Sequence, residues 1–325
     1  MTAAGRIRHE VLDSLPARYR PLEGWSGPRR RDWSWQFDAV GGGTRLLIKV
    51  PRWAGVDTLD DAVAAGPQPD TQGEFAALSA MAAAVAGSGD RRLAAVQPVV
   101  YVPGVNAVVL EWLDAIPLGA RLGWTVPAAT AGSLLGSTGA WLRVCHDAIG
   151  AWVVEPFDGK TAAAACRGAV DSLHDSPSGI AQAAARVAAA AGRLDGHRVQ
   201  VGTIHGDFSL RNVLVTGDGR VAVIDPNRYR GGAMTDPARL AAELVLGRAR
   251  LVTGGLLPGS ARVRRWVGAF MEGYGRHDES LFAYEWAAAS LRRWLDLEAG
   301  MTGARRVVLA ADRHLFKSEI GRLAA

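Results

Sequence analysis

The sequence predicts an α+β fold with two lobes, a small N-terminal lobe with an antiparallel sheet plus one helix and a larger, mostly helical C-terminal lobe. Three observations support this prediction. The chain has 325 residues, more than a domain with a single hydrophobic core usually contains. Strand patterns dominate before residue 113, and helical patterns dominate after it. We therefore divide the chain into residues 1–112 and residues 113–325.

The N-terminal lobe is predicted from alternating apolar residues. Trp33, Trp35 and Phe37 alternate with polar residues, three glycines at 41–43 form a turn, and residues 45–50 form an apolar strand around Lys49. Residues 56–69 are rich in turn formers and predict a connection. The remaining predicted elements of this lobe are a helix over 71–86, capped by Thr71 with Glu74 at the third position after it, and strands over 96–101 and 107–112.

The C-terminal lobe is predicted to be helical with a short strand region in its middle. A strand over 199–204 precedes a polar loop, and a hairpin over 213–215 and 221–224 follows it. No clear strand pattern lies between Leu113 and Val199. The predicted helices span 130–148, two segments within 161–194, 237–250, 261–274, 279–298 and 304–323.

The composition is that of a globular protein, with 49% hydrophobic and 21% charged residues. A net charge of +5 suits an anionic partner, but the arginines are scattered and the longest run is Arg29–Arg31. A nucleoside triphosphate accounts for this charge, so we expect no nucleic-acid partner. Cys145 and Cys166 lie in helical patterns without metal-ligand spacing, which predicts reduced packing residues.

The apolar runs are too short and too often interrupted by charge to predict a membrane span. Residues 1–10 lack the apolar core of a secretory signal. We therefore expect a cytoplasmic protein. No feature of the sequence indicates an oligomeric state.

The strongest chemical signal is the loop that follows the strand over 199–204. Asp207 and Asn212 are five residues apart, the spacing of the kinase catalytic loop, in which the Asp accepts a hydroxyl proton and the Asn binds metal. Asp225 ends the next hairpin, where a second metal ligand is expected. Lys49 is the only lysine of the N-terminal strands and suits the nucleotide phosphates, and Glu74 on the following helix can hold it extended.

These residues resemble the aminoglycoside phosphotransferase and small-molecule kinase superfamily, which shares the protein-kinase fold. His205-Gly206-Asp207 followed by Asn212 is similar to its catalytic loop, and Ile224-Asp225-Pro226 stands where protein kinases have Asp-Phe-Gly. The resemblance implies a protein-kinase-like fold and an enzyme that uses ATP, in some members GTP, with Mg²⁺. It implies Asp207 as the catalytic base, with Asn212 and Asp225 as metal ligands. Asp236 resembles a further family Asp that braces the metal loop, although a helix N-cap role is equally open.

The resemblance also assigns the nucleotide contacts. Lys49, held by Glu74, would contact the α and β phosphates, and the segment around Glu111 and Leu113 looks like the linker whose backbone binds adenine. The sequence departs from the kinase pattern because no Gly-x-Gly-x-x-Gly loop precedes Lys49. The segment Gly24–Arg31 is then the candidate for the loop that covers the phosphates.

The predicted reaction transfers the γ-phosphoryl group of ATP to a hydroxyl of a small molecule. Arg211, Arg228 and Arg230 flank the loop and disfavour a polycationic acceptor, so a sugar or sugar-containing compound is expected. Arg211 and Arg228 are candidate substrate contacts. The alternatives are an aminoglycoside-type antibiotic phosphotransferase, a catalytically degenerate nucleotide-binding relative and, from the charge, a nucleic-acid binder. His205 is expected to order the backbone, and His146 and His174 are assigned no role.

Overall fold

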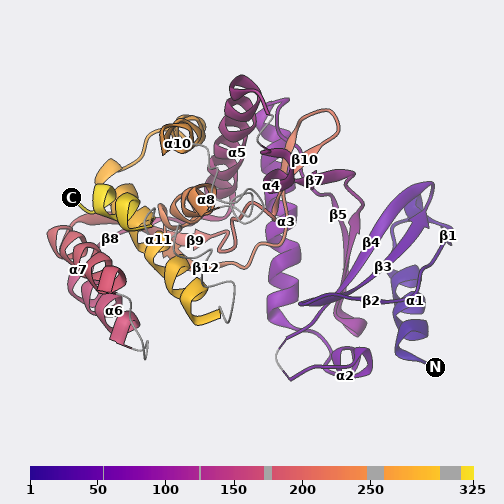
Figure 1. Ribbon diagram of the computed structural model, residues 1–325. Helices are drawn as coiled ribbons and strands as arrows, with labels where there is room; N and C mark the ends of the chain where they lie inside the picture. The colour runs from indigo at the N-terminus through magenta and orange to yellow at the C-terminus, as the bar shows by residue number, and fades with distance from the viewer. Residues whose placement is uncertain (54, 124–125, 172–177, 247–259, 301–315) are drawn as a thin grey trace. The chain divides into compact units, whose positions relative to one another are not determined.

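The computed structural model describes residues 1–53, 55–123, 126–171, 178–246, 260–300 and 316–325 (Figure 1). Its contacts group into two compact units, one of residues 1–115 and 216–226 and the other of residues 116–215 and 227–325. The α+β class is confirmed, with an antiparallel sheet in the N-terminal part and mostly helices in the C-terminal part. Within the described ranges, no helix is long and apolar enough to cross a membrane.

The first unit is built on an antiparallel sheet in the order β1-β3-β4-β6-β5, with β2 also pairing with β3 (Figure 1). The predicted hairpin is confirmed as β3 and β4, in which Gln36 pairs with Lys49. The strands are β1 (Leu22–Glu23), β2 (Arg29–Arg30), β3 (Ser34–Gly41), β4 (Thr44–Pro51), β5 (Pro98–Val102) and β6 (Ala107–Glu111), and a short 3₁₀ turn, Pro103–Val105, joins the last two.

One face of this sheet carries the hydrophobic core. Alternate strand residues such as Phe37, Ile48 and Val109 are fully buried on it, as the period of two requires. Two helices that the sequence analysis missed pack there, α1 (Ala3–Ser14) and α2 (Leu59–Ala64), and a 3₁₀ turn over Ala17–Tyr19 follows the first. The residues between Phe37, Ile48 and Val109 point to the other face, and Lys49 is one of them.

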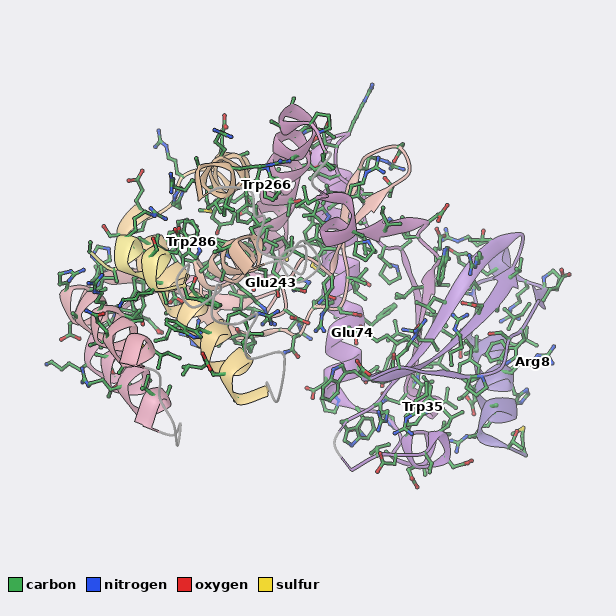
Figure 2. All side chains as sticks on the ribbon, viewed as in Figure 1. Arg8, Trp35, Glu74, Glu243, Trp266 and Trp286 are labelled. Carbon is green, nitrogen blue, oxygen red and sulfur yellow. The ribbon has the colours of Figure 1, made fainter. Side chains whose placement is uncertain are left out.

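The helix α3 (Pro69–Ser88) packs on β5 and β6. The predicted start at Thr71 is wrong, because Pro69 occupies the first turn and Thr71 is buried inside the helix. Proline suits the first turn, since its fixed φ matches the helix and its missing N–H has no partner there in any case. Glu74 therefore lies one turn inside the helix and projects from it (Figure 2).

The second unit contains a three-stranded antiparallel sheet in the order β12-β9-β8. The predicted strand over 199–204 is confirmed as β9 (Arg198–Ile204), but its partners β8 (Val153–Pro156) and β12 (Tyr229–Gly232) were not predicted. Both are only four residues long, and β12 contains two glycines, so neither has a clear period of two. The register pairs Tyr229 with Ile204, directly before the catalytic-loop segment.

The predicted helices of the second unit are confirmed over their described parts. Two of them, α5 and α10, are in backbone contact through glycines. The residues 301–315 of the predicted helix over 304–323 lie outside the described part, and residues 316–323 are helical. The helices are α4 (Leu118–Arg121), α5 (Ala128–Ile149), α6 (Gly159–Asp171), α7 (Ser178–Arg193), α8 (Thr235–Leu246), α10 (Ser260–Tyr274) and α11 (Glu279–Gly300).

Three short strands complete the described elements. They are β7 (Ala115–Pro117), β10 (Val213–Thr216) and β11 (Val221–Val223). The last two correspond to the predicted hairpin, whose turn is closed by hydrogen bonds between Thr216 and Arg220. β7 was not predicted, because it has only three residues and ends at a proline.

Candidate active site

The catalytic-loop segment begins where β9 ends, and a buried carboxylate fixes its backbone. Asp236 is 0% exposed and lies in the first turn of α8. It accepts hydrogen bonds from the backbone N–H of His205 at 2.7 Å and of Gly206 at 2.9 Å. His205 itself is fully buried, and its carbonyl accepts from the N–H of Asn227 and Arg228. Asp236 therefore holds the two residues that precede Asp207.

A second layer of contacts holds Asp236 itself. His146 of α5 approaches the Asp236 carboxylate with Nε2 at 3.0 Å, and its Nδ1 lies 2.9 Å from the hydroxyl of Tyr274 on α10. Burial raises the pKa of Asp236, but the His146 bond and the Gly206 N–H outweigh it and hold that pKa below its usual range. Asp236 is thus a buried anion with several donors.

The structure corrects the sequence analysis at His146, which was assigned no partner or role. His146 lies four residues after Leu142, on the inward face of α5, and both side chains are buried. A histidine at a core position of a predicted helix needs a polar partner, and this position was the available signal. His174 lies outside the described residues.

Gly206 is the residue that separates this loop from the His-Arg-Asp form of protein kinases. It adopts a φ of +82°, a conformation that side chains other than glycine rarely allow. A Cβ atom there would also lie 2.7 Å from the ring of Tyr229, which packs across it from β12. Backbone conformation and space therefore both require glycine.

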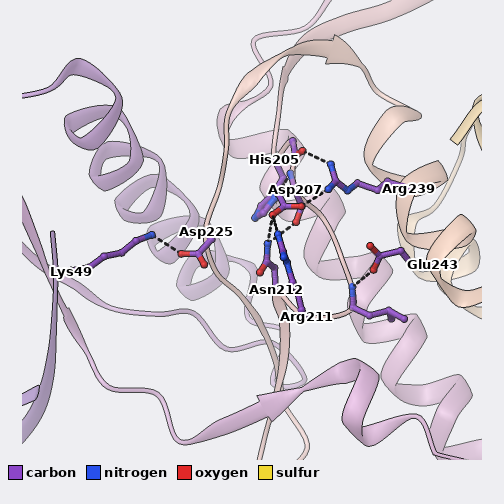
Figure 3. A network of polar contacts seen from close by, with 10 residues as sticks. Lys49, His205, Asp207, Arg211, Asn212, Asp225, Arg239 and Glu243 are labelled. Carbon is purple, nitrogen blue, oxygen red and sulfur yellow. Dashed lines mark hydrogen bonds and ion pairs between the residues drawn. The ribbon is translucent and has the colours of Figure 1, made fainter. Parts of the chain in front are cut away.

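Asp207 is the only carboxylate in this loop, and three side chains contact it (Figure 3). Arg211 donates to Oδ2 at 2.9 Å, and the Asn212 amide donates to the same oxygen at 2.8 Å. Arg239 of α8 forms an ion pair with Oδ1 at 2.6 Å and donates to the Gly206 carbonyl at 2.9 Å. Arg239 was missed by the sequence analysis, because it lies 32 residues further along the chain. Two guanidinium groups thus surround a carboxylate that is 17% exposed.

The amide of Asn212 has a defined orientation. Its nitrogen donates to the backbone carbonyl of Asp207 at 2.9 Å and to the Asp207 carboxylate. With the nitrogen engaged, the amide oxygen is the atom left for an external ligand. The next residue of the loop is held as well, since the N–H of Leu210 donates to Glu243 of α8 at 2.8 Å. The structure therefore brings Asp207 and Asn212 together, as predicted.

The first unit contains a separate cluster of the predicted residues (Figure 3). The Lys49 ammonium lies 2.8 Å from the Glu74 carboxylate and 2.7 Å from that of Asp225. Burial lowers the pKa of Lys49, but these two carboxylates outweigh it, so the pKa is raised and the lysine stays charged. Asp225 has a left-handed φ of +55°, and its side chain is 50% exposed. The predicted contact between Lys49 and Glu74 is present, and Asp225 also contacts Lys49.

The sheet face that bears Lys49 is apolar beside it. Leu47 of β4 lies opposite Leu110 of β6, and Lys49 lies opposite Val108. Directly opposed residues share one face of a sheet, so Leu47, Val108 and Leu110 lie on the face that bears Lys49. Val108 and Leu110 are buried, whereas Leu47 is half-buried and can contact a ligand.

The segment around Glu111 and Leu113 lies at the end of β6. The N–H of Glu111 donates to Gln97 and that of Trp112 donates to Arg45, which fixes the end of β6. The Glu111 carboxylate is held by the hydroxyl of Tyr19 at 2.5 Å, and burial together with this carboxylate raises the pKa of Tyr19. Leu113 is half-buried. The side chain of Glu111 is thus occupied, and a nucleotide contact there would use backbone atoms.

The segment Gly24–Arg31, the candidate for the loop that covers the phosphates, lies along the edge of β3. Ser26 exchanges hydrogen bonds with the backbone of Asp38, and Arg29 makes a two-pronged ion pair with the Asp38 carboxylate. Arg29 and Arg30 form β2, so the prediction of a loop is wrong there. The tight turn lies at 31–34, where the N–H of Arg31 donates to Ser34.

Arg228 and Arg230 were predicted to place positive charge beside the loop. Arg228 is exposed in a left-handed conformation, whereas Arg230 forms an ion pair with Glu155. Of the alternating tryptophans, Trp33 is exposed at the turn and Trp35 is buried in the core. Cys145 and Cys166 are both free thiols, as predicted.

Comparison with known proteins identifies one family. The family model described as the phosphotransferase enzyme family matches residues 61–289, more than half of the chain. This range includes Glu74, Asp207, Asn212, Asp225 and Asp236. A search of the curated proteins found no match.

Solved structures with the same fold are small-molecule kinases. An amicoumacin kinase in complex with AMP-PNP, Ca²⁺ and Ami superposes with a TM-score of 0.59 at 13% identity, covering 98% of this chain and 93% of that one. A glucosamine kinase superposes with a TM-score of 0.58 at 18% identity, covering 98% and 84%. A spectinomycin phosphotransferase with ADP and spectinomycin gives 0.53 at 11%, covering 98% and 97%. At these identities, the likeness shows the kinase-like fold.

Proposed function

The chain belongs to the phosphotransferase enzyme family, and from this premise we propose that this small-molecule phosphotransferase moves the γ-phosphoryl group of ATP to a hydroxyl of a sugar or sugar-containing compound. The observation that carries the proposal is the loop in which Asp207 and Asn212 contact each other and Asp236 holds the preceding backbone. That arrangement supplies a fixed carboxylate for a hydroxyl and a fixed amide for a metal.

The first unit supplies the groups for the nucleotide. Lys49 stays protonated between two carboxylates, and because Asp225 is half exposed, phosphate oxygens can take its place beside the lysine. Glu74 then keeps the lysine extended, as the lysine and helix glutamate do in protein kinases. Leu47, half-buried on the sheet face that bears Lys49, is proposed to contact adenine, with backbone atoms of Glu111 and Leu113 as the polar contacts of the base.

The residues present fit Mg²⁺. One carboxylate oxygen of Asp225 contacts Lys49, and this side chain is half exposed. The Asn212 amide nitrogen donates to the Asp207 carbonyl, which leaves the amide oxygen for a metal. Mg²⁺ prefers oxygen ligands and in kinases is held by one or two protein groups together with phosphates and water. We propose that Asn212 and Asp225 hold it. When bound, the ion supplies neutralisation of the phosphate charge.

Asp207 is proposed to act on the acceptor. The hydroxyl oxygen attacks the γ-phosphorus, the bond from that phosphorus to the β,γ-bridging oxygen breaks, and the hydroxyl proton passes to an Asp207 oxygen. The products are the phosphorylated acceptor and ADP. Arg239 and Asn212 hold the carboxylate in one orientation, because each contacts it and also a neighbouring backbone carbonyl.

The charges around Asp207 support a neutral or anionic acceptor. Arg211 and Arg239 contact the carboxylate directly and offset its charge. A polycation brought to this carboxylate would meet both guanidinium groups. An aminoglycoside-type antibiotic is a polycation and would require a more acidic surface.

The proposal is tested with purified protein, ATP and Mg²⁺ against a panel of neutral sugars, amino sugars, sugar acids and aminoglycosides. ADP formation is measured first, and the phosphorylated product is then identified by mass spectrometry. We expect turnover with at least one sugar and a kcat about 10²–10⁴-fold lower in the Asp207→Ala variant.

Two outcomes would contradict the proposal. ATP binding in a thermal-shift assay without turnover of any acceptor would favour the degenerate, nucleotide-binding alternative. Turnover restricted to aminoglycosides would favour the antibiotic phosphotransferase, and would mean that Arg211 and Arg239 do not control acceptor charge.

A further inference from the structure

In the first unit, the N-terminal segment of the chain contacts the end of β6 through Tyr19. This residue is the last of the 3₁₀ turn that follows α1, and it is 2% exposed. Its hydroxyl donates to the Glu111 carboxylate at 2.5 Å. Glu111 lies opposite the buried Leu46, so its side chain is on the core face of the sheet, where Tyr19 packs. The segment before the sheet therefore holds the residue at which β6 ends.

Arg18 fixes the direction of this hydrogen bond. Its Nη2 donates to the Tyr19 hydroxyl at 2.8 Å, and its guanidinium carbon lies 4.7 Å from the centre of the Tyr19 ring. A hydroxyl has one proton, so an oxygen that accepts from Arg18 directs its own proton to Glu111. Burial and the hydrogen bond to Glu111 raise the pKa of Tyr19, so the hydroxyl keeps that proton at neutral pH.

The β3–β4 hairpin fixes the backbone of residues 18 and 19. A Cβ atom on Gly41 would lie 2.6 Å from the carbonyl oxygen of Tyr19, and one on Gly42 would lie 2.0 Å from that of Arg18. A Cβ atom on Gly43 would have no neighbour within 4 Å. Two of the three glycines therefore allow the backbone of the N-terminal segment to pack directly against the hairpin.

The residue after Glu111 is held on the other face of the sheet. The N–H of Trp112 donates to the Arg45 carbonyl at 2.8 Å, and the Arg45 guanidinium lies 3.9 Å from the centre of the Trp112 ring. The N–H of Leu113 makes no hydrogen bond within the described part of the chain. Contacts of Tyr19 on one face and of Arg45 on the other thus determine the path of the chain from β6 to Leu113.

We propose that the contact between Tyr19 and Glu111 determines selectivity for adenine over guanine nucleotides. This inference rests on the proposed function, in which backbone atoms of Glu111 and Leu113 contact the base. A carbonyl oxygen and an N–H match adenine, whose edge presents an amino donor and a ring-nitrogen acceptor. Guanine presents an acceptor and a donor at these places, so the same backbone atoms repel it. Tyr19 is then a positioning residue, because a linker that can shift can pair with either base.

The experiment measures base selectivity without phosphoryl transfer. ADP and GDP are titrated calorimetrically, with Mg²⁺, into the wild type, Tyr19→Phe and Tyr101→Phe. Tyr101 is the matched control, because its hydroxyl also makes a hydrogen bond in the first unit, to Asn106 before the start of β6. We expect the wild type to bind ADP about tenfold more tightly than GDP or better, and Tyr19→Phe to reduce this ratio about fivefold or more. Tyr101→Phe should change the ratio less than about twofold.

Two variants of Glu111 separate the hydrogen bond from the charge. In Glu111→Gln the amide oxygen still accepts from Tyr19, so the ratio should stay within about twofold of the wild type. Glu111→Ala has no acceptor and should reduce the ratio as Tyr19→Phe does. An equal loss in both variants would show that charge controls selectivity, and would overturn the proposal.

The glycines of the hairpin provide a test that leaves Tyr19 and Glu111 unchanged. Gly42 and Gly43 have φ of +54° and +79°, so an alanine at either position strains the backbone. Only the Cβ atom at 42 meets Arg18, so only Gly42→Ala should reduce the ratio of ADP to GDP affinity. Circular dichroism and thermal unfolding check that each variant is folded.

The outcomes separate this inference from the proposed function. An unchanged ratio in Tyr19→Phe, an equal loss in Tyr101→Phe, or equal affinity of the wild type for ADP and GDP would each overturn the inference and leave the proposed phosphoryl transfer standing. A wild type that binds neither nucleotide would instead overturn the proposed function, and the inference with it.

Discussion

The two clusters of predicted site residues are built in opposite ways. In the first unit, one cation lies between two carboxylates, and one of these, Asp225, is half exposed and held by a single contact. In the second unit, one carboxylate, Asp207, lies between two arginines, and buried bonds from Asp236 fix the backbone before it. In the first cluster a ligand can take the place of Asp225 beside Lys49, whereas in the second the fold fixes the position of Asp207.

This difference predicts how the two clusters respond to substitution. Loss of Asp225 from the first should affect ligand binding and leave folding nearly unaltered, because this side chain is half exposed and exposed ion pairs add little stability. Changes in the buried brace of the second should affect folding, because a buried donor without an acceptor is costly. The variants below are ordered from the largest expected effect to the smallest.

The Asp207→Ala variant should lower kcat by about 10²–10⁴-fold, the usual contribution of a positioned general base. Nucleotide affinity should persist, because Lys49 and Glu74 are untouched. Single-turnover kinetics with radiolabelled ATP measures the chemical step, and Asp147→Ala, an exposed residue of α5, is the control. Retained turnover when chemistry limits the rate would refute the role of Asp207.

The Asp236→Asn variant should lose about 1–3 kcal/mol of unfolding free energy, the cost of leaving a buried donor without an acceptor. The amide nitrogen would face one of two N–H groups, that of His205 or that of Gly206, because they donate to different oxygens of the carboxylate. Because the pKa of Asp236 is lowered by folding, its contribution is complete above the unfolded pKa of about 3.9 and is lost as the pH falls through the folded value.

Urea denaturation between pH 3 and pH 7 measures this difference. The gap between the wild type and Asp236→Asn should be widest at pH 7 and narrow below about pH 3.9. A constant gap over that range would show that the charge of Asp236 does not stabilise the loop.

The Gly206→Ala variant should cost about 1–3 kcal/mol, the usual price of a non-glycine residue in a strained conformation. The added Cβ also meets the Tyr229 ring. The double variant Gly206→Ala/Tyr229→Ala relieves the collision but not the backbone strain, so a double-mutant cycle in urea should show partial recovery. Strict additivity would mean that the ring does not limit residue 206.

The Asp225→Asn variant should change the unfolding free energy by less than about 1 kcal/mol, since Lys49 keeps its contact with Glu74. The same variant should abolish the dependence of ATP affinity on Mg²⁺, measured by calorimetry with and without the ion. Loss of stability comparable to that of Asp236→Asn would contradict the contrast between the two clusters.

Much of the fold was predictable, because its longer elements carry clear periodicity. The β3–β4 hairpin and the helices α5 and α11 have strong period-two or helical patterns. The missed elements are short: β8 and β12 contain four residues each, and their pairing with β9 depends on contacts distant in sequence.

The site residues were predictable where spacing within one segment fixes the geometry. Asp207 and Asn212 share a loop, so their contact follows from local structure. Arg239 and His146 reach the same loop from α8 and α5, and no local pattern places a helix residue against a loop 32 or 59 residues away. Tertiary packing alone brings them there.

The packing of Tyr229 on Gly206 has a consequence for how this enzyme can evolve. A lineage that carries both residues loses stability when it acquires a side chain at 206 in one step, because the first change meets the aromatic ring before any benefit appears. A smaller residue acquired first at 229 lowers this loss, and the backbone strain at 206 remains. The order of substitutions is therefore constrained, and the two positions are expected to change together among descendants of this chain.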